Sequence, residues 1–214
     1  MSDAATRLDK VRTNIARAAK LARRNPAEVT LVAVSKRRSV EEIEALIAAG
    51  QRDFGESRVQ EAQDKWPPLR AAHPHLRLHM IGRLQSNKAA EAAALFDVIH
   101  SLDRTSLLDA LAAAPDHRPA FVQVNVGNEE QKGGVALAEL ATFLAAVRAS
   151  PVPLAGLMAI PPQGLEPGPF FALLHELARR HDVAGLSMGM SSDYTTAVTL
   201  GATVVRVGTA LFED

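Results

Sequence analysis

The sequence of 214 residues contains no cysteine, which excludes disulfide bonds, thiolate metal sites and cysteine nucleophiles. Long apolar runs are also missing, because no stretch approaches the roughly 20 residues that a membrane-spanning helix requires. The N-terminus lacks the compact hydrophobic segment of a secretory signal. From these absences we expect a cytoplasmic protein without a membrane partner.

A net charge is missing as well, since 24 basic side chains balance 24 acidic ones. This balance argues against a dedicated nucleic-acid binder, which would carry a large basic surface. The 7 histidines show no metal-ligand spacing, and the chain has no Gly-rich dinucleotide motif, P-loop or nucleophile elbow. We therefore expect no nucleic-acid partner and no bound metal, and any anion-binding site must be local.

The first 24 residues are basic and have helical periodicity. Such a stretch can imitate an organellar transit peptide, but Asp3 and Asp9 are unusual in one. Apolar residues recur there at three- and four-residue steps and form one stripe, which consists of Leu8, Val11, Ile15, Ala18 and Ala22. We interpret this segment as an extra N-terminal helix that packs on the core.

After this helix, short β-rich apolar runs alternate with longer helical patterns, which indicates parallel strands joined by crossover helices. The expected strands are residues 30–34, 53–54, 78–81, 98–101, 121–126, 154–160, 185–188 and 203–207. Eight strands favour an α/β fold, a single (β/α)8 TIM barrel domain over residues 1–214. A doubly wound open sheet has the same local pattern and is the alternative.

The helical patterns have recognisable ends. Ser39 and Glu42 predict a capping box before an apolar helix that ends at Gly50. Other helices are expected to begin near residues 57, 86, 104, 136, 169 and 193, with Asp193 capping the last of these. Residues 161–169 contain four prolines, but they follow a strand and precede a helix. We interpret them as a βα loop and not as a domain boundary.

Lys36 is the first candidate for chemistry, because it follows a nearly all-apolar strand. Reactive groups of a (β/α)8 barrel lie where strands end, so Lys36 would project at the barrel mouth. Low-dielectric walls there favour the neutral amine, which attacks aldehydes, and Arg37 and Arg38 would act in the same direction. The alternative is a solvated lysine that ends a strand and begins an exposed basic run.

The second group of candidates lies in the loops after the last two strands, where barrels of this kind often bind phosphate. Gly189 and Gly208 would let the backbone approach an anion closely, and Ser187 and Thr209 would donate hydroxyl hydrogen bonds. Met188 belongs to the first of these loops. The alternative is that all five are ordinary turn residues. A lysine at the mouth together with a phosphate cradle predicts a site for a phosphorylated aldehyde.

Arg206 lies close to the end of the last apolar strand, where a charge requires a partner or a ligand. Its position suggests pairing with a heterocycle nitrogen, and a structural salt bridge is the alternative. His79 and Asn125 also lie near strand ends. They either contact the ring of a ligand or satisfy buried backbone groups.

Six motifs, in this order and over nearly the whole chain, resemble the YggS/PROSC family of pyridoxal phosphate homeostasis proteins. They are Ala33-Val34-Ser35-Lys36, Phe54-Gly55-Glu56, His79-Met80-Ile81-Gly82 with Leu84-Gln85-Ser86-Asn87-Lys88, Gly156-Leu157-Met158-Ala159-Ile160, Leu186-Ser187-Met188-Gly189-Met190-Ser191 and Val205-Arg206-Val207-Gly208-Thr209. The resemblance implies a fold-type III barrel similar to the N-terminal domain of alanine racemase. It also implies pyridoxal 5'-phosphate (PLP) as the cofactor, bound through its aldehyde to Lys36.

The resemblance further implies phosphate contacts from Ser187, Gly208 and Thr209, and it places Arg206 opposite the pyridine nitrogen. The remaining cofactor-binding candidates are Met188, Gly189 and His79. Members of the family are regarded as cofactor-binding proteins without established catalytic activity, so no catalytic residue is expected.

The chain departs from the family pattern at three positions near the second and third strands. Ser57 and Arg58 stand where the family usually has Asn and Tyr, and Leu78 stands where it usually has an aromatic residue. Cofactor contacts of those family residues are therefore not carried over to this chain.

A carrier is favoured over an enzyme, because an arginine does not readily give up its proton. Arg206 would leave the pyridine nitrogen unprotonated, which disfavours carbanion chemistry. Racemases with this barrel add a second domain and a tyrosine base from a partner subunit, whereas this chain ends at Asp214 and has one tyrosine, Tyr194.

We therefore expect a monomer that acts in vitamin B6 homeostasis and holds PLP reversibly as a Schiff base on Lys36. Its expected partners are PLP, other B6 vitamers and, transiently, PLP-dependent apoenzymes. The alternatives are a weak PLP-dependent amino-acid racemase, which would turn over amino acids steadily, and a lysine-dependent aldolase, which would ignore PLP.

Overall fold

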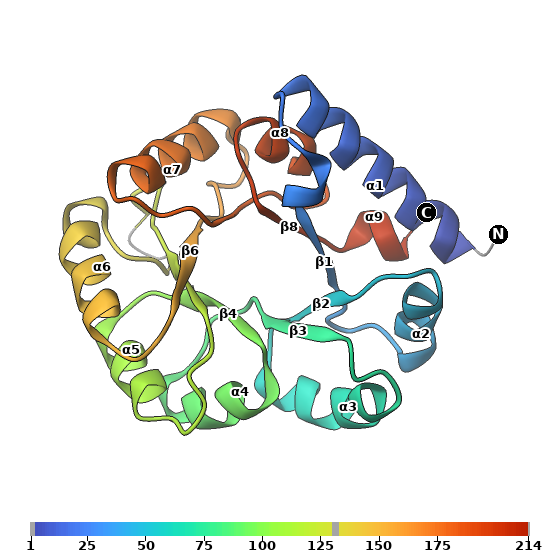
Figure 1. Cartoon of the computed structure of the whole chain (residues 1–214), viewed down its shortest axis with the longest axis horizontal. Coiled ribbons are helices and arrows are strands. Elements are labelled where there is room, and N and C mark those ends of the chain that lie inside the picture. Colours follow the sequence, from blue (N-terminus) through green and yellow to red (C-terminus); the bar gives the residue numbers. More distant parts are fainter. Residues whose placement is uncertain (1–2, 130–132, 214) are drawn as a thin grey trace.

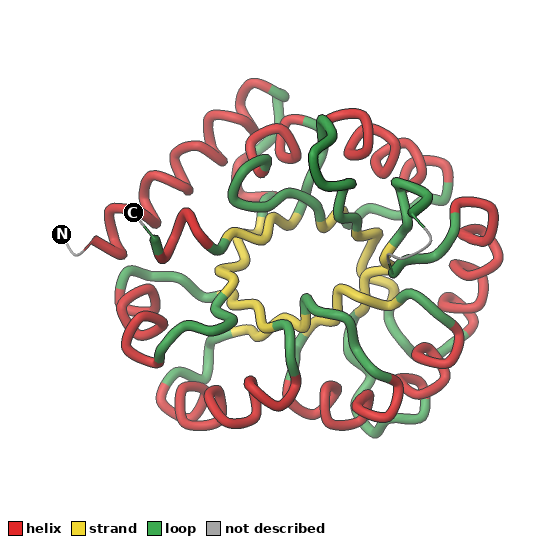
Figure 2. The backbone as a smooth tube through the Cα atoms, turned by 180° about the vertical axis from the view of Figure 1, so that it is seen from behind, coloured by secondary structure: helices red, strands yellow, loops and turns green. Residues whose placement is uncertain are grey.

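The computed structural model describes residues 3–129 and 133–213. These residues form eight parallel strands that close into a barrel, each strand pairing with the next and β8 with β1 (Figure 2). The strands are β1 (Thr30–Val34), β2 (Asp53–Glu56), β3 (Arg77–Met80), β4 (Val98–Leu102), β5 (Ala120–Gln123), β6 (Leu154–Met158), β7 (Leu186–Ser187) and β8 (Val204–Val207). The predicted barrel is confirmed, and the open sheet is wrong.

Helices surround the strands (Figure 1). They are α1 (Asp3–Leu21), α2 (Val40–Ala48), α3 (Val59–Ala72), α4 (Ala89–Leu95), α5 (Thr105–Ala112), α6 (Leu140–Ala149), α7 (Gly168–Arg180), α8 (Tyr194–Thr199) and α9 (Thr209–Phe212). Short 3-10 turns are η1 (Pro26–Glu28), η2 (Ser86–Lys88) and η3 (Leu137–Glu139). The predicted helix starts are therefore correct to within a few residues, and residues 161–167 form the predicted βα loop.

The extra N-terminal helix is α1. Leu8, Val11, Ile15 and Ala18 are buried as predicted, whereas Ala22 follows the end of the helix and is only half-buried. The buried stripe packs α1 against α2, α8 and α9, so the two ends of the described chain lie side by side (Figure 1). This placement brings α1 to the mouth of the barrel beside β8.

Strands β5, β6 and β7 are shorter than predicted. The apolar run of β5 continues to Val126, but its strand pairing ends at Gln123. Asn125 bends the chain there, because its side chain donates to Glu129 O at 2.9 Å and accepts from Glu129 N at 3.1 Å. An apolar run reports burial, which continues in the loops after strand pairing has ended.

The apolar core has two parts. The larger one fills the layer between strands and helices and includes Leu31, Ala33 and Val205. A separate cluster contains Val32 and Val204 together with Phe121 and Met158. Because neighbouring residues of a strand point to opposite faces, this second cluster lies inside the barrel.

Local capping signals had mixed outcomes. The capping box at α2 is confirmed, with Glu42 N donating to Ser39 Oγ at 3.3 Å and Ser39 N to Glu42 Oε2 at 2.8 Å. Gly50 follows α2 with φ of 96°. Asp193 occupies the predicted N-cap position of α8, but its carboxylate accepts from Met190 N at 2.6 Å and does not bond a helix N–H. Asp193 therefore closes the β7–α8 loop on itself.

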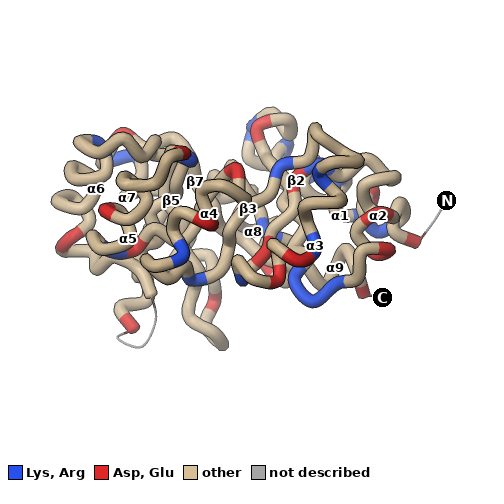
Figure 3. The backbone as a smooth tube through the Cα atoms, turned by 90° about the horizontal axis from the view of Figure 1, so that it is seen from below, with Lys and Arg blue, Asp and Glu red and all other residues tan. Residues whose placement is uncertain are grey.

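Basic and acidic residues are interspersed along the elements (Figure 3), in agreement with the formal charge of zero. In the described ranges, no helix combines the length and hydrophobicity needed to cross a membrane. Histidine and carboxylate side chains in those ranges form no group that could hold a metal ion.

Candidate cofactor site

A pocket of about 850 Å³ lies at the carboxyl ends of β1 and β8. Four predicted site residues line it, namely Lys36, Arg206, Gly208 and Thr209. Other lining residues come from α1, from the end of β1, from the β7–α8 region and from the end of the described chain, including Arg7, Lys10, Val34, Met190, Ser191, Tyr194 and Glu213. Barrel closure thus brings together residues from both ends of the sequence.

The pocket is cationic. Four basic side chains line it, and Glu213 is the acidic residue among its lining residues. The carboxylate of Glu213 forms an ion pair with Arg38, which lowers its influence on the pocket. An excess of fixed positive charge in a concave site attracts an anion such as a phosphate monoester.

Lys36 is exposed and lies in the turn after β1. Within the described residues, its ammonium group forms no hydrogen bond or ion pair. Arg38, which was expected to act on it, is engaged elsewhere through Glu42 and Glu213 and stacks 5.1 Å from the ring centroid of Phe212. The Lys36 amine is therefore free to react.

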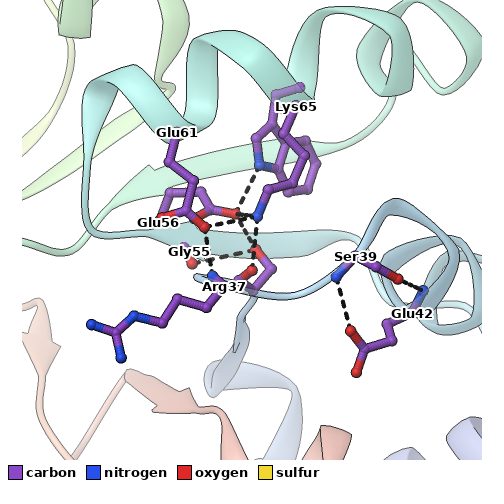
Figure 4. A network of polar contacts seen from close by, with 9 residues as sticks. Arg37, Ser39, Glu42, Gly55, Glu56, Glu61 and Lys65 are labelled. Atoms are coloured by element: carbon purple, nitrogen blue, oxygen red, sulfur yellow. Dashed lines mark hydrogen bonds and ion pairs between the residues drawn. The ribbon is translucent and has the colours of Figure 1, made fainter.

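A buried polar cluster holds the turn on the N-terminal side of Lys36 (Figure 4). We call Ser35, Glu56, Glu61, Lys65 and Trp66 the lysine clamp. Glu56 Oε1 accepts from Ser35 Oγ at 2.8 Å, and it accepts from Lys65 Nζ and Trp66 Nε1 at 3.0 Å each. Lys65 Nζ also donates to Ser35 O at 3.0 Å. Glu56 thus connects β1, β2 and α3 directly beneath the turn.

The clamp also holds the other side of the turn. Arg37 adopts a left-handed conformation with φ of 60°, which costs a non-glycine residue about 1 kcal/mol. Its N–H donates to Glu61, and Lys65 Nζ holds the same carboxylate at 3.1 Å. Burial disfavours ionisation of Glu61, but the Arg37 N–H and the Lys65 ammonium outweigh it, so the pKa of Glu61 is lowered.

Arg206 is buried, with 4% of its surface exposed. Burial lowers the pKa of its guanidinium to about 10, although the charge of Asp193 opposes this shift. Its Nη2 donates to Ala159 O at 3.1 Å, and its Nη1 donates to Ser187 Oγ. No carboxylate in the described residues forms an ion pair with it, so the structural salt bridge is not what holds Arg206.

The loops after β7 and β8 are joined by Ser191. Its Oγ accepts from Gly208 N at 3.1 Å and from Ala210 N at 3.5 Å, which leaves its hydroxyl proton free for an anion. Thr209 is exposed at the start of α9. A Cβ on Gly208 would lie 3.4 Å from Val34, an ordinary contact, so packing does not require glycine there.

The other four predicted site residues, Ser187, Met188, Gly189 and His79, do not line this pocket. Ser187 and Met188 are fully buried. Gly189 has φ of 96°, and a Cβ there would lie 2.5 Å from Ala197 Cβ. Close packing of the loop on α8 therefore requires glycine at this position, whether or not a ligand binds.

His79 lies in the barrel interior and bonds other side chains. Its Nε2 is 3.0 Å from Asp53 Oδ1, and its Nδ1 is 3.0 Å from His100 Nε2. His100 Nδ1 in turn lies 2.8 Å from Ser187 Oγ. Burial, with the nearby charge of Arg206, holds the pKa of His100 well below its usual 6.5.

Two of the departures from the family pattern belong to a different pocket. Ser57 and Arg58 line a space of about 650 Å³ at the carboxyl ends of β2 and β3, together with Arg83, Lys88 and Arg104. Leu78 is fully buried on the helix side of β3. The three departures therefore leave the lining of the Lys36 pocket intact.

The β7–α8 loop and α1 contribute two pocket residues that the sequence did not single out, Ser191 and Lys10, and they bring in Tyr194, which the sequence named only as the one tyrosine. Ser191 lies within one of the six motifs, so the sequence could have identified its hydroxyl as a site residue. Lys10 could not be identified in this way, because only the packing of α1 brings it to the mouth of the barrel. Tyr194 is buried, and its hydroxyl accepts from Asn14 Nδ2 of α1 at 3.0 Å.

A parallel (β/α)8 barrel with an unpaired lysine after its first strand and a Gly-Thr loop after its last, both lining one pocket, is the arrangement to compare with known barrels. Residues 6–214 match the family described as alanine racemase, N-terminal domain. The pyridoxal phosphate homeostasis proteins of Escherichia coli K12 and Pseudomonas aeruginosa are 40% and 41% identical, and each alignment covers 99% of this chain. They are covered over 97% and 96% of their own length. The chain belongs to this family, and within it to the pyridoxal phosphate homeostasis proteins.

Solved structures agree with this assignment. PipY of Synechococcus elongatus, determined with PLP bound, is 38% identical and superposes with a TM-score of 0.78 over 92% of this chain and 99% of its own. Alanine racemase of Bartonella henselae with covalently bound PLP superposes with a TM-score of 0.71 over 94% of this chain and 57% of its own, at 15% identity. The second likeness shows the fold alone.

Proposed function

We propose that this chain binds PLP as a Schiff base on Lys36 and acts as a reversible PLP carrier in vitamin B6 homeostasis. The observation that carries the proposal is the convergence of Lys36, Arg206, Gly208 and Thr209 on one cationic pocket. The PLP bound to PipY and the names of the curated relatives support it.

The pocket fits the cofactor chemically. Lys36 supplies a free amine, and the hydroxyls of Thr209 and Ser191 would bind the phosphate, with Ser191 held in place by the Gly208 N–H. Arg206 would donate to the ring nitrogen. When bound, PLP supplies an electrophilic aldehyde, and the remaining chemistry consists of binding and release. Contacts from Ser187, Met188, Gly189 and His79 stay predictions.

The pocket favours storage over turnover. A pyridoxal enzyme needs a positioned acid or base, and the two candidates among the described lining residues are engaged. Tyr194 bonds Asn14 at 3.0 Å, and Glu213 pairs with Arg38. Arg206 would also keep the ring nitrogen unprotonated, because an arginine retains its proton at neutral pH. The chain is accordingly proposed to have no catalytic residue.

The experiment that tests the proposal compares Lys36→Ala with Lys10→Ala, since both lysines line the same pocket. Purified proteins are mixed with PLP, their visible absorbance is recorded, and hydride-reduced adducts are mapped to peptides. We expect a visible band in the wild type and in Lys10→Ala, none in Lys36→Ala, and an adduct on Lys36. A band that survives in Lys36→Ala, or an adduct on Lys10, would refute the proposal.

A weak amino-acid racemase is the second candidate, and one observation favours it. Tyr194 lines the pocket and, like Glu213, has a side chain that could act as a base there. Loaded protein is incubated with L-alanine, and D-alanine is measured over time in the wild type and in Tyr194→Phe. Steady production that Tyr194→Phe abolishes would support the racemase, whereas a carrier produces none and transfers PLP to an added apoenzyme.

We further propose that the chain works as one domain over residues 1–214 and as a monomer in the cytoplasm. It would also accept other B6 vitamers and contact PLP-dependent apoenzymes. An aldolase would instead ignore PLP and be trapped by hydride with a sugar phosphate.

A further inference from the structure

A continuous row of hydrogen-bonded side chains leads from the N-terminal end of β2 through the barrel interior to Arg206. We call Asp53, His79, His100 and Ser187 the arginine relay. The steps are Asp53 Oδ1 to His79 Nε2 at 3.0 Å, His79 Nδ1 to His100 Nε2 at 3.0 Å, and His100 Nδ1 to Ser187 Oγ at 2.8 Å. Arg206 Nη1 then donates to Ser187 Oγ.

With both rings neutral, the chemistry of the two ends determines the direction of every hydrogen bond. Arg206 can only donate and the carboxylate of Asp53 can only accept, so each neutral ring directs its N–H toward the Asp53 end, and Ser187 Oγ accepts from Arg206 and donates its own proton to His100 Nδ1. His100 then carries its proton on Nε2 and donates to His79, which likewise carries its proton on Nε2 and donates to Asp53. With both rings neutral, each of these contacts has one donor and one acceptor.

The surroundings suit neutral rings. His79 and His100 have 3% and 0% of their surface exposed, and the His100 ring stacks on Phe121 with a centroid distance of 4.6 Å. Burial lowers the pKa of His100, and the charge of Arg206 acts in the same direction. The carboxylate at the far end is partly exposed, at 13%, and Arg77 pairs with it at 2.7 Å.

The relay fixes the guanidinium of Arg206 from behind. Two of its nitrogens are bound to Ser187 Oγ and Ala159 O, which determines the plane of the group. A row of hydrogen bonds that all point the same way is polarised along its length, so the charge of Asp53 strengthens the acceptor that Arg206 contacts. Because no carboxylate within residues 3–129 and 133–213 pairs directly with Arg206, this polarised row stabilises a buried cation that lines the pocket.

We propose that Asp53, His79, His100 and Ser187 are positioning residues that orient Arg206 toward the ring nitrogen of the bound cofactor. The inference rests on the proposed function, because it assigns Arg206 to the ring. It also gives Ser187 a role other than phosphate binding, since the one hydroxyl proton of Ser187 is used by His100.

The first test uses the protein without cofactor and reads the protonated nitrogen of each imidazole by ¹H–¹⁵N NMR. In the wild type at neutral pH we expect both rings to be neutral with the proton on Nε2. Ser187→Ala should allow the proton of His100 to occupy either ring nitrogen. Asp53→Ala should have the same effect on His79. Asp97→Ala is the matched control, because Asp97 also pairs with an arginine near a strand start but lies outside the relay. It should change neither ring.

The second test compares PLP with pyridoxal, which has the same ring and no phosphate. If Ser187 acts through Arg206, Ser187→Ala weakens both ligands by the same factor, about tenfold for a hydrogen bond to a charged group. If Ser187 binds phosphate, only PLP is weakened. Thr209→Val is the control on the phosphate side and should weaken PLP alone.

The outcomes separate the two proposals. Wild-type protein that binds no PLP refutes the proposed function. The relay is refuted if either wild-type ring is charged or carries its proton on Nδ1, or if Ser187→Ala leaves pyridoxal affinity unchanged in a wild-type protein that binds PLP. Asp53→Ala keeps the test available if Ser187→Ala does not fold, because Asp53 lies at the exposed end of the relay.

Discussion

Lys36 and Arg206 line the same pocket but are held in opposite ways. Lys36 is exposed, and the lysine clamp bonds the residues before and after it and leaves its amine free. Arg206 is buried, and the arginine relay bonds its side chain directly. In the proposed function, Lys36 forms and breaks a covalent bond and is positioned through its backbone, whereas Arg206 recognises the ligand and is positioned through its own atoms.

The difference follows from what each group must do. An amine that attacks an aldehyde has to lose a proton and change partners, so permanent hydrogen bonds to it would oppose the reaction. A guanidinium that recognises a ring nitrogen gains from being fixed beforehand, because less ordering remains when the ligand binds. Four experiments can break or sharpen this comparison.

The largest effect is expected from Glu56→Ala, which removes the acceptor at the centre of the lysine clamp. Ser35, Lys65 and Trp66 would each lose a partner in a buried environment. Breaking a buried ion pair by removing one member costs roughly 3–5 kcal/mol of the free energy of unfolding. Urea denaturation measures it. Glu44→Ala, at an exposed position on α2, is the control. A loss below about 1 kcal/mol for Glu56→Ala would show that the clamp is not structural.

Gly189 and Gly208 should respond differently to alanine. Gly189→Ala combines positive φ with a Cβ 2.5 Å from Ala197, so we expect a loss of about 1–3 kcal/mol in the free energy of unfolding. Gly208→Ala has room beside Val34 and should leave stability nearly unchanged while weakening PLP binding. Denaturation and PLP titration of both variants check this. Equal stabilities would contradict the packing role of Gly189.

Acid should destabilise the protein through His100. Its pKa is lowered in the folded state, so below about 6.5 the unfolded chain binds a proton that the folded chain does not. The contribution of His100 to the free energy of unfolding is therefore constant above this pH. It falls as the pH decreases from 6.5 toward the pKa of His100 in the folded state. Thermal unfolding across this range measures the slope. His100→Phe should reduce the slope, and an unchanged slope would contradict the assignment.

The smallest effect is expected from Glu61→Gln, at the half-buried edge of the clamp. The ion pair with Lys65 is partly solvated, so we expect a loss of about 1 kcal/mol or less near neutral pH. The lowered pKa of Glu61 contributes stability above its usual 4.5, and this is lost as the pH falls below it. The difference between wild type and variant should therefore vanish in acid. A difference that persists there would point to packing.

Local pattern predicted much of the pocket, and its failures have physical reasons. Lys36, Gly208 and Thr209 were found because each directly follows an apolar strand, and strand ends meet at one face of a barrel. Gly189 was assigned to a phosphate, although packing against α8 already requires a glycine there. His100 was not singled out, because its partners His79 and Ser187 are distant in sequence.

The sequence by itself determined the order of strands and helices, the capping box of α2, the buried stripe of α1 and the lysine at the mouth. These depend on periodicity and on neighbours a few residues apart, which a chain specifies locally. Only the tertiary structure decided that Lys10 and Ser191 line the pocket and that Asp53 connects to Arg206. Closure of the barrel creates such contacts between distant strands, and no local pattern encodes which side chains then meet.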